Sequence, residues 1–341
     1  MNSKRLHTKA LDSGALSFIG GKLIRLATVL SAISIICFVL MAFSPIDPLI
    51  QYLGGESAVV SGEKARRIAS ELGLDKPYHI QYLNWIKRFL QGDFGYSIFY
   101  EQPVAQVIKE KAGASILLLS VSWIFTGIFG FGLGVVAAIK EGKIADRIIK
   151  VYALAMASAP QYWVGLLLVM IFAVKLGWFP VGLSSSINGT RENASIMDTI
   201  IHLFLPALTL SLSGIAHMTL HVRQKLLGIF STDYVLFAKA RGEGTLMLFK
   251  NHGFRNVLLP AVTIQFASLG EIFGGSTLVE KVFSYPGLGS AIVTAGIKGD
   301  IPLLLGISLC SSVFVFTGNF LADVICYFLD PRIGKGGLYE L

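Results

Sequence analysis

Residues 112–139 read AGASILLLSVSWIFTGIFGFGLGVVAAI and contain no charged side chain. An α-helix that crosses a bilayer needs about 20 mostly apolar residues, because each residue adds about 1.5 Å and every backbone polar group must be bonded inside the helix. This stretch exceeds that length. It therefore predicts a transmembrane helix.

Five further stretches meet the same criterion. Across the 341 residues, 53% are hydrophobic and 15% are charged, whereas an ordinary soluble domain has roughly 25% charged residues. Pro160 and Pro206 lie inside two of the stretches, and we expect a helix in a bundle to tolerate them. The sequence predicts an all-α polytopic membrane protein with six transmembrane helices. The five stretches are residues 26–46, 151–174, 199–222, 256–279 and 301–322.

The distribution of basic residues predicts the orientation. Lys and Arg favour cytoplasmic loops, and they concentrate before the first stretch, at residues 140–150 and 223–255, and after the sixth. The opposite short connections hold only Lys175, Arg191, Lys281 and Lys298. Both termini should be cytoplasmic. The first stretch ends without a small-residue cleavage site, so we interpret it as a retained anchor.

The positions of the three cysteines and of the basic residues, which give a net charge of +8, argue against other classes of protein. Cys37, Cys310 and Cys326 all lie in apolar stretches, which argues against a disulfide framework or a thiolate metal site. Membrane orientation explains the dispersed basic residues better than nucleic-acid binding does. His217 and His221 have helical spacing, but the sequence shows no third ligand, so we expect no metal site.

The predicted external loop at residues 47–111 is long for a connection. Residues 61–74 have a helical composition, and residues 80–90 place apolar side chains at helical spacing. Two short amphipathic helices are expected there. They either pack on the bundle or contact an external partner.

The predicted cytoplasmic segment at residues 223–255 carries the most specific pattern. Residues 231–233 (Ser-Thr-Asp) favour a helix start, Gly242 and Gly244 break the helix, and a second short helix should start after Thr245 and end before Pro260. Tyr234, Phe237 and residues 246–249 supply more apolar surface than a solvated loop needs. The segment is either a docking element for a cytoplasmic protein or a helix pair lying on the lipid surface.

Several motifs occur in a consistent order along residues 22–333. They are GLDKP (73–77), QYLNW (81–85), GDFGYS (92–97), APQYW (159–163), DYVLFAKARG (233–242), NHGFRNVLLP (251–260), VFSYPGLG (282–289) and LDPR (329–332). In these motifs the chain resembles the permease subunits of ATP-binding-cassette (ABC) importers, in the oligopeptide, dipeptide and nickel branch. Residues 236–238 (Leu-Phe-Ala) replace the Glu-Ala-Ala that names the family's EAA loop, Glu243 stands where a small apolar residue is common, and residues 1–21 have no counterpart.

This resemblance implies how the chain is organised. Residues 1–21 would be a cytoplasmic extension, residues 22–333 the permease domain with its external loop at 47–111 and coupling loop at 223–255, and residues 334–341 a cytoplasmic tail. The protein would lie in the inner membrane of a bacterium or archaeon. It would work with a second permease subunit, two ABC ATPase subunits and an external solute-binding protein, and it would import peptides or nickel complexes by alternating access.

The resemblance also implies which residues dock the ATPase. No Gly-x-x-x-x-Gly-Lys-Ser/Thr loop occurs in the sequence, so we expect the chain to be no enzyme and to bind no cofactor itself, with ATP and Mg²⁺ held by the partner ATPases. A self-sufficient channel and an intramembrane enzyme are the rival hypotheses. The expected docking residues are Asp233, Tyr234, Phe237, Ala238, Ala240, Arg241, Gly242 and Arg255.

Glu271 is the one charged residue in the six apolar stretches. A carboxylate at mid-depth costs at least about 2.5 kcal/mol, so it should face a pathway or a partner. The alternative is a hydrogen-bonded carboxyl that holds the last two spans together. Two groups of glycines are expected to let helices approach closely: Gly270, Gly274 and Gly275 beside Glu271, and Gly130 with Gly134 in the stretch 112–139.

Overall fold

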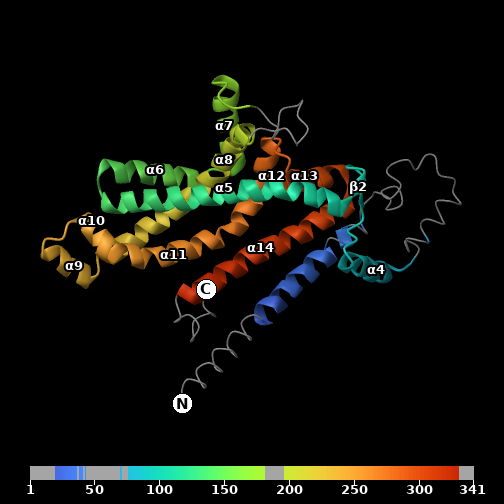
Figure 1. Cartoon of the computed structure of the whole chain (residues 1–341), viewed down its shortest axis with the longest axis horizontal. Helices are drawn as coiled ribbons and strands as arrows, with labels where there is room; N and C mark the ends of the chain where they lie inside the picture. The colour runs from blue at the N-terminus through green and yellow to red at the C-terminus, as the bar shows by residue number, and fades with distance from the viewer. Residues whose placement is uncertain are drawn as a thin grey trace, which may run out of the picture. The chain divides into compact units, whose positions relative to one another are not determined.

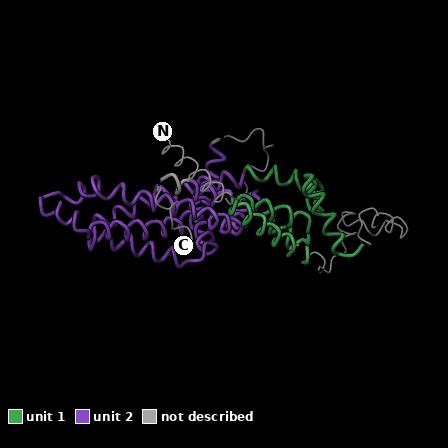
Figure 2. The backbone as a smooth tube through the Cα atoms, turned by 90° about the horizontal axis from the view of Figure 1, so that it is seen from below, with its two compact units in different colours: residues 1–113, 290–316 green, residues 114–289, 317–341 purple. Residues whose placement is uncertain are grey.

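The computed structural model describes residues 20–36, 38–40, 43, 70, 76–180 and 196–329. In these ranges the chain is mainly helical, and the strands form one two-stranded antiparallel sheet, Tyr96–Ser97 (β1) with Gln102–Pro103 (β2). The chain divides into two compact units, which are coloured separately in Figure 2. Unit 1 comprises residues 1–113 and 290–316, and unit 2 comprises residues 114–289 and 317–341.

Four helices among the described residues are long and apolar enough to cross a membrane, and the number rises to six if each of two bent helix pairs is one span. The four are Gly20–Leu40, α5 (Val104–Ile139), α8 (Ile196–Phe230) and α14 (Ile301–Leu329) (Figure 1). Most described residues of all six predicted stretches lie on these helices and pairs. The all-α polytopic fold is confirmed.

The predicted third span is not one continuous helix. It consists of α6 (Ile144–Ser158) and α7 (Gln161–Leu168), which continues as the π-helix η2 (Val169–Lys175), and the two parts meet at 110°. Ala159 before Pro160 is extended, with φ −81° and ψ 133°, as steric contact with a following proline ring favours. The expectation that a helix in a bundle tolerates Pro160 was wrong, because the helix is interrupted there.

Two other prolines do lie inside helices. Pro206 lies in α8, as expected. Pro260 lies in α11 (Phe254–Ala267), so the prediction that a short helix ends before Pro260 was also wrong. A proline removes one backbone hydrogen bond, and neighbouring helices in a bundle can outweigh that loss. The second bend, of 43°, comes after Ala267, where α12 (Leu269–Val282) begins.

Unit 2 is held together by close contact between α5 and α8. A Cβ on Gly130 would lie 2.6 Å from the Cβ of Met218, and a Cβ on Gly134 would lie 2.7 Å from the Cβ of Val222. The hydroxyl of Thr219 donates to the carbonyl oxygen of Gly130 at 3.2 Å. These two glycines therefore let the helix backbones approach, as the sequence predicts.

A buried carboxyl group closes the turn after α12. Glu280 is fully buried, and its Oε1 accepts a hydrogen bond from the Ser115 hydroxyl at 2.7 Å. The same hydroxyl oxygen accepts the Leu288 N–H at 2.7 Å. Gly287 and Gly289 leave the space that this carboxyl group occupies. The VFSYPGLG motif thus forms a fixed turn that leads into α13 (Leu288–Lys298).

Unit 1 contains the one predicted amphipathic helix that can be compared. It is α4 (Tyr78–Leu90), in agreement with the prediction for residues 80–90, whereas most of residues 61–74 lie outside the described part. Asp300 is buried and joins the sheet to α14. Its carboxylate accepts hydrogen bonds from the Ser97 hydroxyl at 2.6 Å and from the Leu303 N–H at 3.2 Å. Residues 1–19 and 330–341, with the predicted extension and tail, are outside the described residues.

Candidate functional site

The candidate site is the helical loop at residues 231–253, which joins α8 to α11. It contains α9 (Asp233–Ala240), α10 (Thr245–Leu248) and the π-helix η4 (Phe249–Gly253). The first short helix and the break at Gly242 match the prediction from the sequence. The predicted side-chain cap does not form, because the Thr232 hydroxyl donates to the Ile229 carbonyl oxygen and caps no N–H of α9.

Gly242 ends α9 in a turn that favours glycine. Its φ is +96°, a value that L side chains rarely adopt. The Gly242 N–H donates to the carbonyl oxygen of Lys239 at 3.0 Å, and the Glu243 N–H donates to that of Ala238 at 3.3 Å. This pair of bonds is a Schellman motif. It satisfies the last carbonyl groups of α9 and sets the direction of α10.

One face of the helical loop is built into the core of unit 2. Val235 and Ala238 are each 1% exposed, and Leu248 is 3% exposed. They pack in a cluster with residues of α5, α8 and α11, namely Ala138, Met218, Val222, Leu226, Ile229, Val257 and Ala261. Ala238 therefore packs in the core. The expectation that it contacts a partner protein is corrected, because its side chain is covered.

The opposite face carries exposed apolar side chains, which we call the apolar patch. Phe237 and Leu246 are 66% and 70% exposed. The Arg241 guanidinium lies 5.4 Å from the centre of the Phe237 ring. Among the expected docking residues, Asp233, Ala240, Arg241, Gly242 and Arg255 are exposed as well. The apolar patch consists of Tyr234, Leu236, Phe237, Leu246 and Met247.

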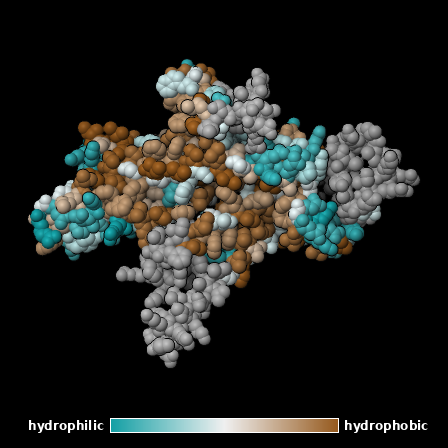
Figure 3. Space-filling view, viewed as in Figure 1, coloured by the Kyte–Doolittle hydropathy of each residue, from teal (hydrophilic) through white to brown (hydrophobic). Residues whose placement is uncertain are grey.

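The apolar patch contrasts with its surroundings. Figure 3 shows hydrophilic colours around α9 and α10, whereas the surface over α6 and the middle of α5 is mainly hydrophobic. Exposed phenylalanine and leucine side chains grouped on a small helical loop mark interaction sites more often than single exposed apolar residues do. The geometry therefore suits a groove on another protein.

Polar contacts join α9 and the turn after it to η4 and α11. Glu243 lies 3.7 Å from the Arg241 guanidinium and 3.6 Å from the His252 ring nitrogen Nε2. The Tyr234 ring packs edge-on against His252 with 5.9 Å between the ring centres, and the Asn256 amide donates to the Tyr234 hydroxyl at 3.4 Å. Glu243, the departure from the family pattern, thus links the turn after α9 to η4.

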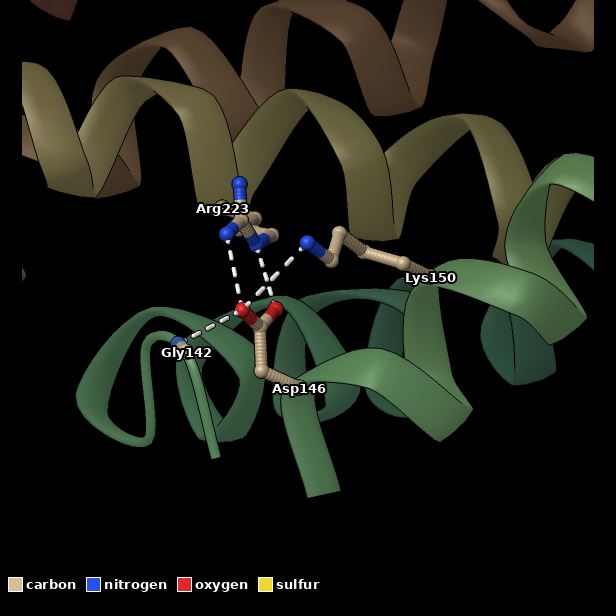
Figure 4. Close-up of polar contacts among 4 residues, drawn as sticks. All are labelled: Gly142, Asp146, Lys150 and Arg223. Atoms are coloured by element: carbon tan, nitrogen blue, oxygen red, sulfur yellow. Dashed lines mark hydrogen bonds and ion pairs between the residues drawn. The ribbon is translucent and has the colours of Figure 1, made fainter. Parts of the chain in front are cut away.

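A buried ion pair fixes the helix that leads into this loop. The Asp146 side chain on α6 is 1% exposed, and its Oδ1 and Oδ2 accept hydrogen bonds from Arg223 on α8 at 2.6 and 2.9 Å. Oδ2 also accepts the Gly142 N–H at 3.0 Å, and Lys150 lies 3.6 Å away (Figure 4). Bidentate arginine–carboxylate pairs are strong and geometrically specific. This clasp of Asp146 with Arg223 joins α6 to α8 seven residues before the end of α8 at Phe230.

The sequence alone did not point to the clasp. From the sequence, Arg223 and Lys150 indicate only how the chain is oriented in the membrane, and Asp146 has no assigned role. The available signal was a single acidic residue in the otherwise basic segment 143–150, next to a glycine turn at Gly142. A lone carboxylate among basic residues at a helix start is a reasonable candidate for a buried pair.

Glu271 lies in the first turn of α12, directly after the 43° bend. Its side chain is exposed on the described chain. The N-terminal end of a helix favours a carboxylate, because the first N–H groups carry partial positive charge. Ala267, Gly274 and Leu278 are exposed at matching helical positions, so Glu271 belongs to one open face of the bent pair.

Comparisons with known proteins cover most of the chain. A family model described as "Binding-protein-dependent transport system inner membrane component" matches residues 130–335, and one described as "Binding-prot-dependent transport system membrane comp, N-term" matches residues 15–118. The oligopeptide transport system permease protein AppB of Bacillus subtilis is 35% identical over 307 residues, which cover 89% of this chain and 95% of that protein.

Two further similarities concern a relative and a solved structure. The di/tripeptide transport system permease protein DppB of Pseudomonas aeruginosa is 32% identical, over 93% of this chain and 98% of that protein. A chain from the inward-facing structure of the MetNI methionine ABC transporter superposes with a TM-score of 0.51 at 17% identity, over 66% of this chain and 97% of that chain. At this identity the superposition supports the fold alone.

Proposed function

Because the chain belongs to the family of binding-protein-dependent transport system inner membrane components, we propose that it is the permease subunit of an ABC importer of peptides. The family match and the apolar helices make it a multi-pass inner-membrane protein. The relatives compared above are named for oligopeptides and for di- and tripeptides, which favours peptides over nickel complexes as the cargo.

The observation that carries this proposal is the construction of the helical loop. Its inner face is buried in the core of unit 2, and its outer face exposes the apolar patch. We assign the apolar patch to a groove on a cytoplasmic ABC ATPase, with Asp233, Ala240, Arg241 and Arg255 at its rim. Because Val235, Ala238 and Leu248 join the helical loop to the membrane helices, a movement of the docked ATPase would move those helices.

Coupling of this kind requires that docking favours one state of the transporter. A contact that is equally strong in the inward-open and outward-open states shifts no equilibrium. The proposed cycle is that nucleotide brings two ATPases together, that the helical loops of two permease subunits move with them, and that the bundle switches its opening. The chain itself would be non-catalytic, with ATP and Mg²⁺ bound by the ATPases.

The remaining partners follow from the same family. A second permease subunit would complete the pathway, and an extracytoplasmic solute-binding protein would deliver the cargo. The clustering of Lys and Arg supports an orientation with both termini in the cytoplasm. In that orientation α9 and α10 lie on the cytoplasmic side, where ATP is available.

Glu271 is our candidate for the translocation pathway. Its exposed position on the open face of α11 and α12 suits a contact with cargo or with the second permease subunit. Peptides carry a protonated amino terminus, so a carboxylate there would attract them. The bend after Ala267 resembles the broken helices that line solute sites in other transporters.

Replacing Glu271 with glutamine is expected to weaken uptake of cationic peptides by roughly tenfold, because a charge-assisted hydrogen bond becomes a neutral one. Uptake of an amino-blocked neutral peptide should change by less than about twofold. The measurement is initial uptake of both peptides into vesicles that contain the complete importer. Equal losses for the two peptides would remove Glu271 from the pathway.

Purification of the tagged chain from its own membrane tests the function. The expected complex contains two permease subunits and two ATPase subunits, counted from the mass of the intact assembly. ATP hydrolysis should rise when the peptide-loaded binding protein is added. Ion conductance by the isolated chain would support a channel instead, and turnover of a substrate by the isolated chain would support an enzyme.

A further inference from the structure

A groove of about 450 Å³ lies in unit 1 between the helix Gly20–Leu40, α4 and α14. This volume is typical of small-molecule sites, which span roughly 300–1,000 Å³. The lining is almost entirely apolar. It includes Leu30 from the first helix, Trp85 and Phe89 from α4, and Leu309, Cys310 and Val313 from α14. Nothing in the transport function assigned above uses this groove.

The α4 wall of the groove is held in place by contacts with its neighbours. The Ser34 and Tyr82 hydroxyl groups are hydrogen-bonded at 2.8 Å, which fixes α4 to the first helix. The Trp85 and Phe89 rings lie 5.5 Å apart, and Phe89 packs edge-on against Phe94 at 4.7 Å. Tilted and edge-on ring contacts of this kind stabilise the packing of neighbouring aromatic side chains. The groove is therefore preformed.

The shape and surroundings of the groove limit what it can hold. Two of its three walls are apolar helices that meet the criterion for membrane spans, so lipid chains surround it. A helix from a partner protein has a diameter of about 10–12 Å and needs a long open face. An open groove bordered by three short stretches of helix suits a thin, flexible and apolar occupant. A lipid acyl chain has these properties.

The charge on α4 indicates the head group. Lys87 and Arg88 occupy the last turn of α4, between the groove residues Ile86 and Phe89, and both are exposed. No acidic residue occurs in α4. An amphipathic helix with an apolar inner face flanked by basic residues lies at the level of the lipid phosphates. Each Lys or Arg near the surface attracts anionic lipid measurably.

We propose that this groove binds one acyl chain of an anionic phospholipid, and that Lys87 and Arg88 hold its phosphate. The acyl chain occupies the space between α4, the helix Gly20–Leu40 and α14. It holds α4 against the helix Gly20–Leu40. The proposal does not depend on the identity of the cargo or on the ATPase contact.

Lipid binding to the purified full chain tests this proposal. The chain in mild detergent is titrated with dioleoyl phosphatidylglycerol or dioleoyl phosphatidylcholine, and native mass spectrometry counts the lipids retained. Val313→Trp fills the groove, and Val136→Trp is its matched control, because these valines are 41% and 40% exposed and Val136 is not part of the groove. The double variant Lys87→Gln/Arg88→Gln removes the charge from α4.

We expect the wild-type chain and Val136→Trp to retain one phosphatidylglycerol with at least roughly tenfold preference over phosphatidylcholine. Val313→Trp should lose this tightly held lipid, and the charge variant should bind the two lipids equally. If Val313→Trp is not monodisperse, Ser31→Phe fills the groove from the first helix in its place. The proposal is overturned if the filled groove retains the lipid or if the charge variant keeps its preference for phosphatidylglycerol.

Discussion

Replacing Gly242 with valine is expected to abolish ATP-driven uptake while leaving the protein inserted in the membrane. Gly242 has a φ of +96°, and holding a β-branched residue there costs on the order of 1–3 kcal/mol. A Cβ at this position would meet no atom within 4 Å, so the strain falls on the backbone. The turn relaxes, the Schellman bonds are lost, and Leu246 and Met247 no longer align with Phe237.

The measurement is uptake of labelled peptide into vesicles that contain the complete importer, with the amount of inserted chain quantified on the same samples. Gly244→Val is the matched control. Gly244 has an ordinary φ of −71°, and an added Cβ there also meets nothing within 4 Å. The control should keep more than about half of wild-type uptake, because valine adopts such extended backbone readily. Normal uptake by Gly242→Val would contradict the docking model.

Replacing Asp146 with alanine should destabilise the folded chain by about 3–5 kcal/mol. Breaking one partner of a buried ion pair leaves the other charge uncompensated, and here Arg223 would lose two hydrogen bonds at 2.6 and 2.9 Å. The free energy of unfolding is measured by denaturant titration in detergent micelles. Lys150→Met is the control, because Lys150 is 39% exposed at 3.6 Å, and it should cost less than about 1 kcal/mol.

The double variant Asp146→Ala/Arg223→Met tests whether the two residues stabilise the chain as a coupled pair or contribute to stability independently. When both charges are removed, no uncompensated arginine charge remains buried. The double variant should therefore regain most of the stability that Asp146→Ala loses. If the double variant is destabilised by the sum of the two single changes, the clasp is not an energetic unit. Its role in holding α8 ahead of the helical loop would then be wrong.

Local signals in the sequence predicted the features that local chemistry determines. Long apolar stretches located the helices, because a backbone in lipid must satisfy its own hydrogen bonds. Glycine at position 242 and the residues before Asp233 predicted α9 to within one residue of its observed end. Gly130 and Gly134 predicted a close helix contact, since small residues have few other roles inside a span.

Features that depend on distant neighbours were not predictable in the same way. Pro160 breaks its span and Pro206 does not, although both are prolines in apolar stretches. The loss of one hydrogen bond is small, so packing around each proline decides the outcome. Ala238 appeared to be a docking residue because it lies in the loop motif, but its burial depends on α5, α8 and α11. The Asp146–Arg223 pair joins residues 77 positions apart.

The most direct test of the coupling proposal is ATP-driven peptide uptake by the complete importer after residues 233–248 are replaced with a flexible Gly-Ser segment of equal length. The account predicts that uptake falls to the level of vesicles without ATP, and that the two ATPase subunits no longer copurify in stoichiometric amount. Undiminished uptake by this assembly would contradict the claim that the α9–α10 segment transmits the work of ATP hydrolysis to the membrane helices.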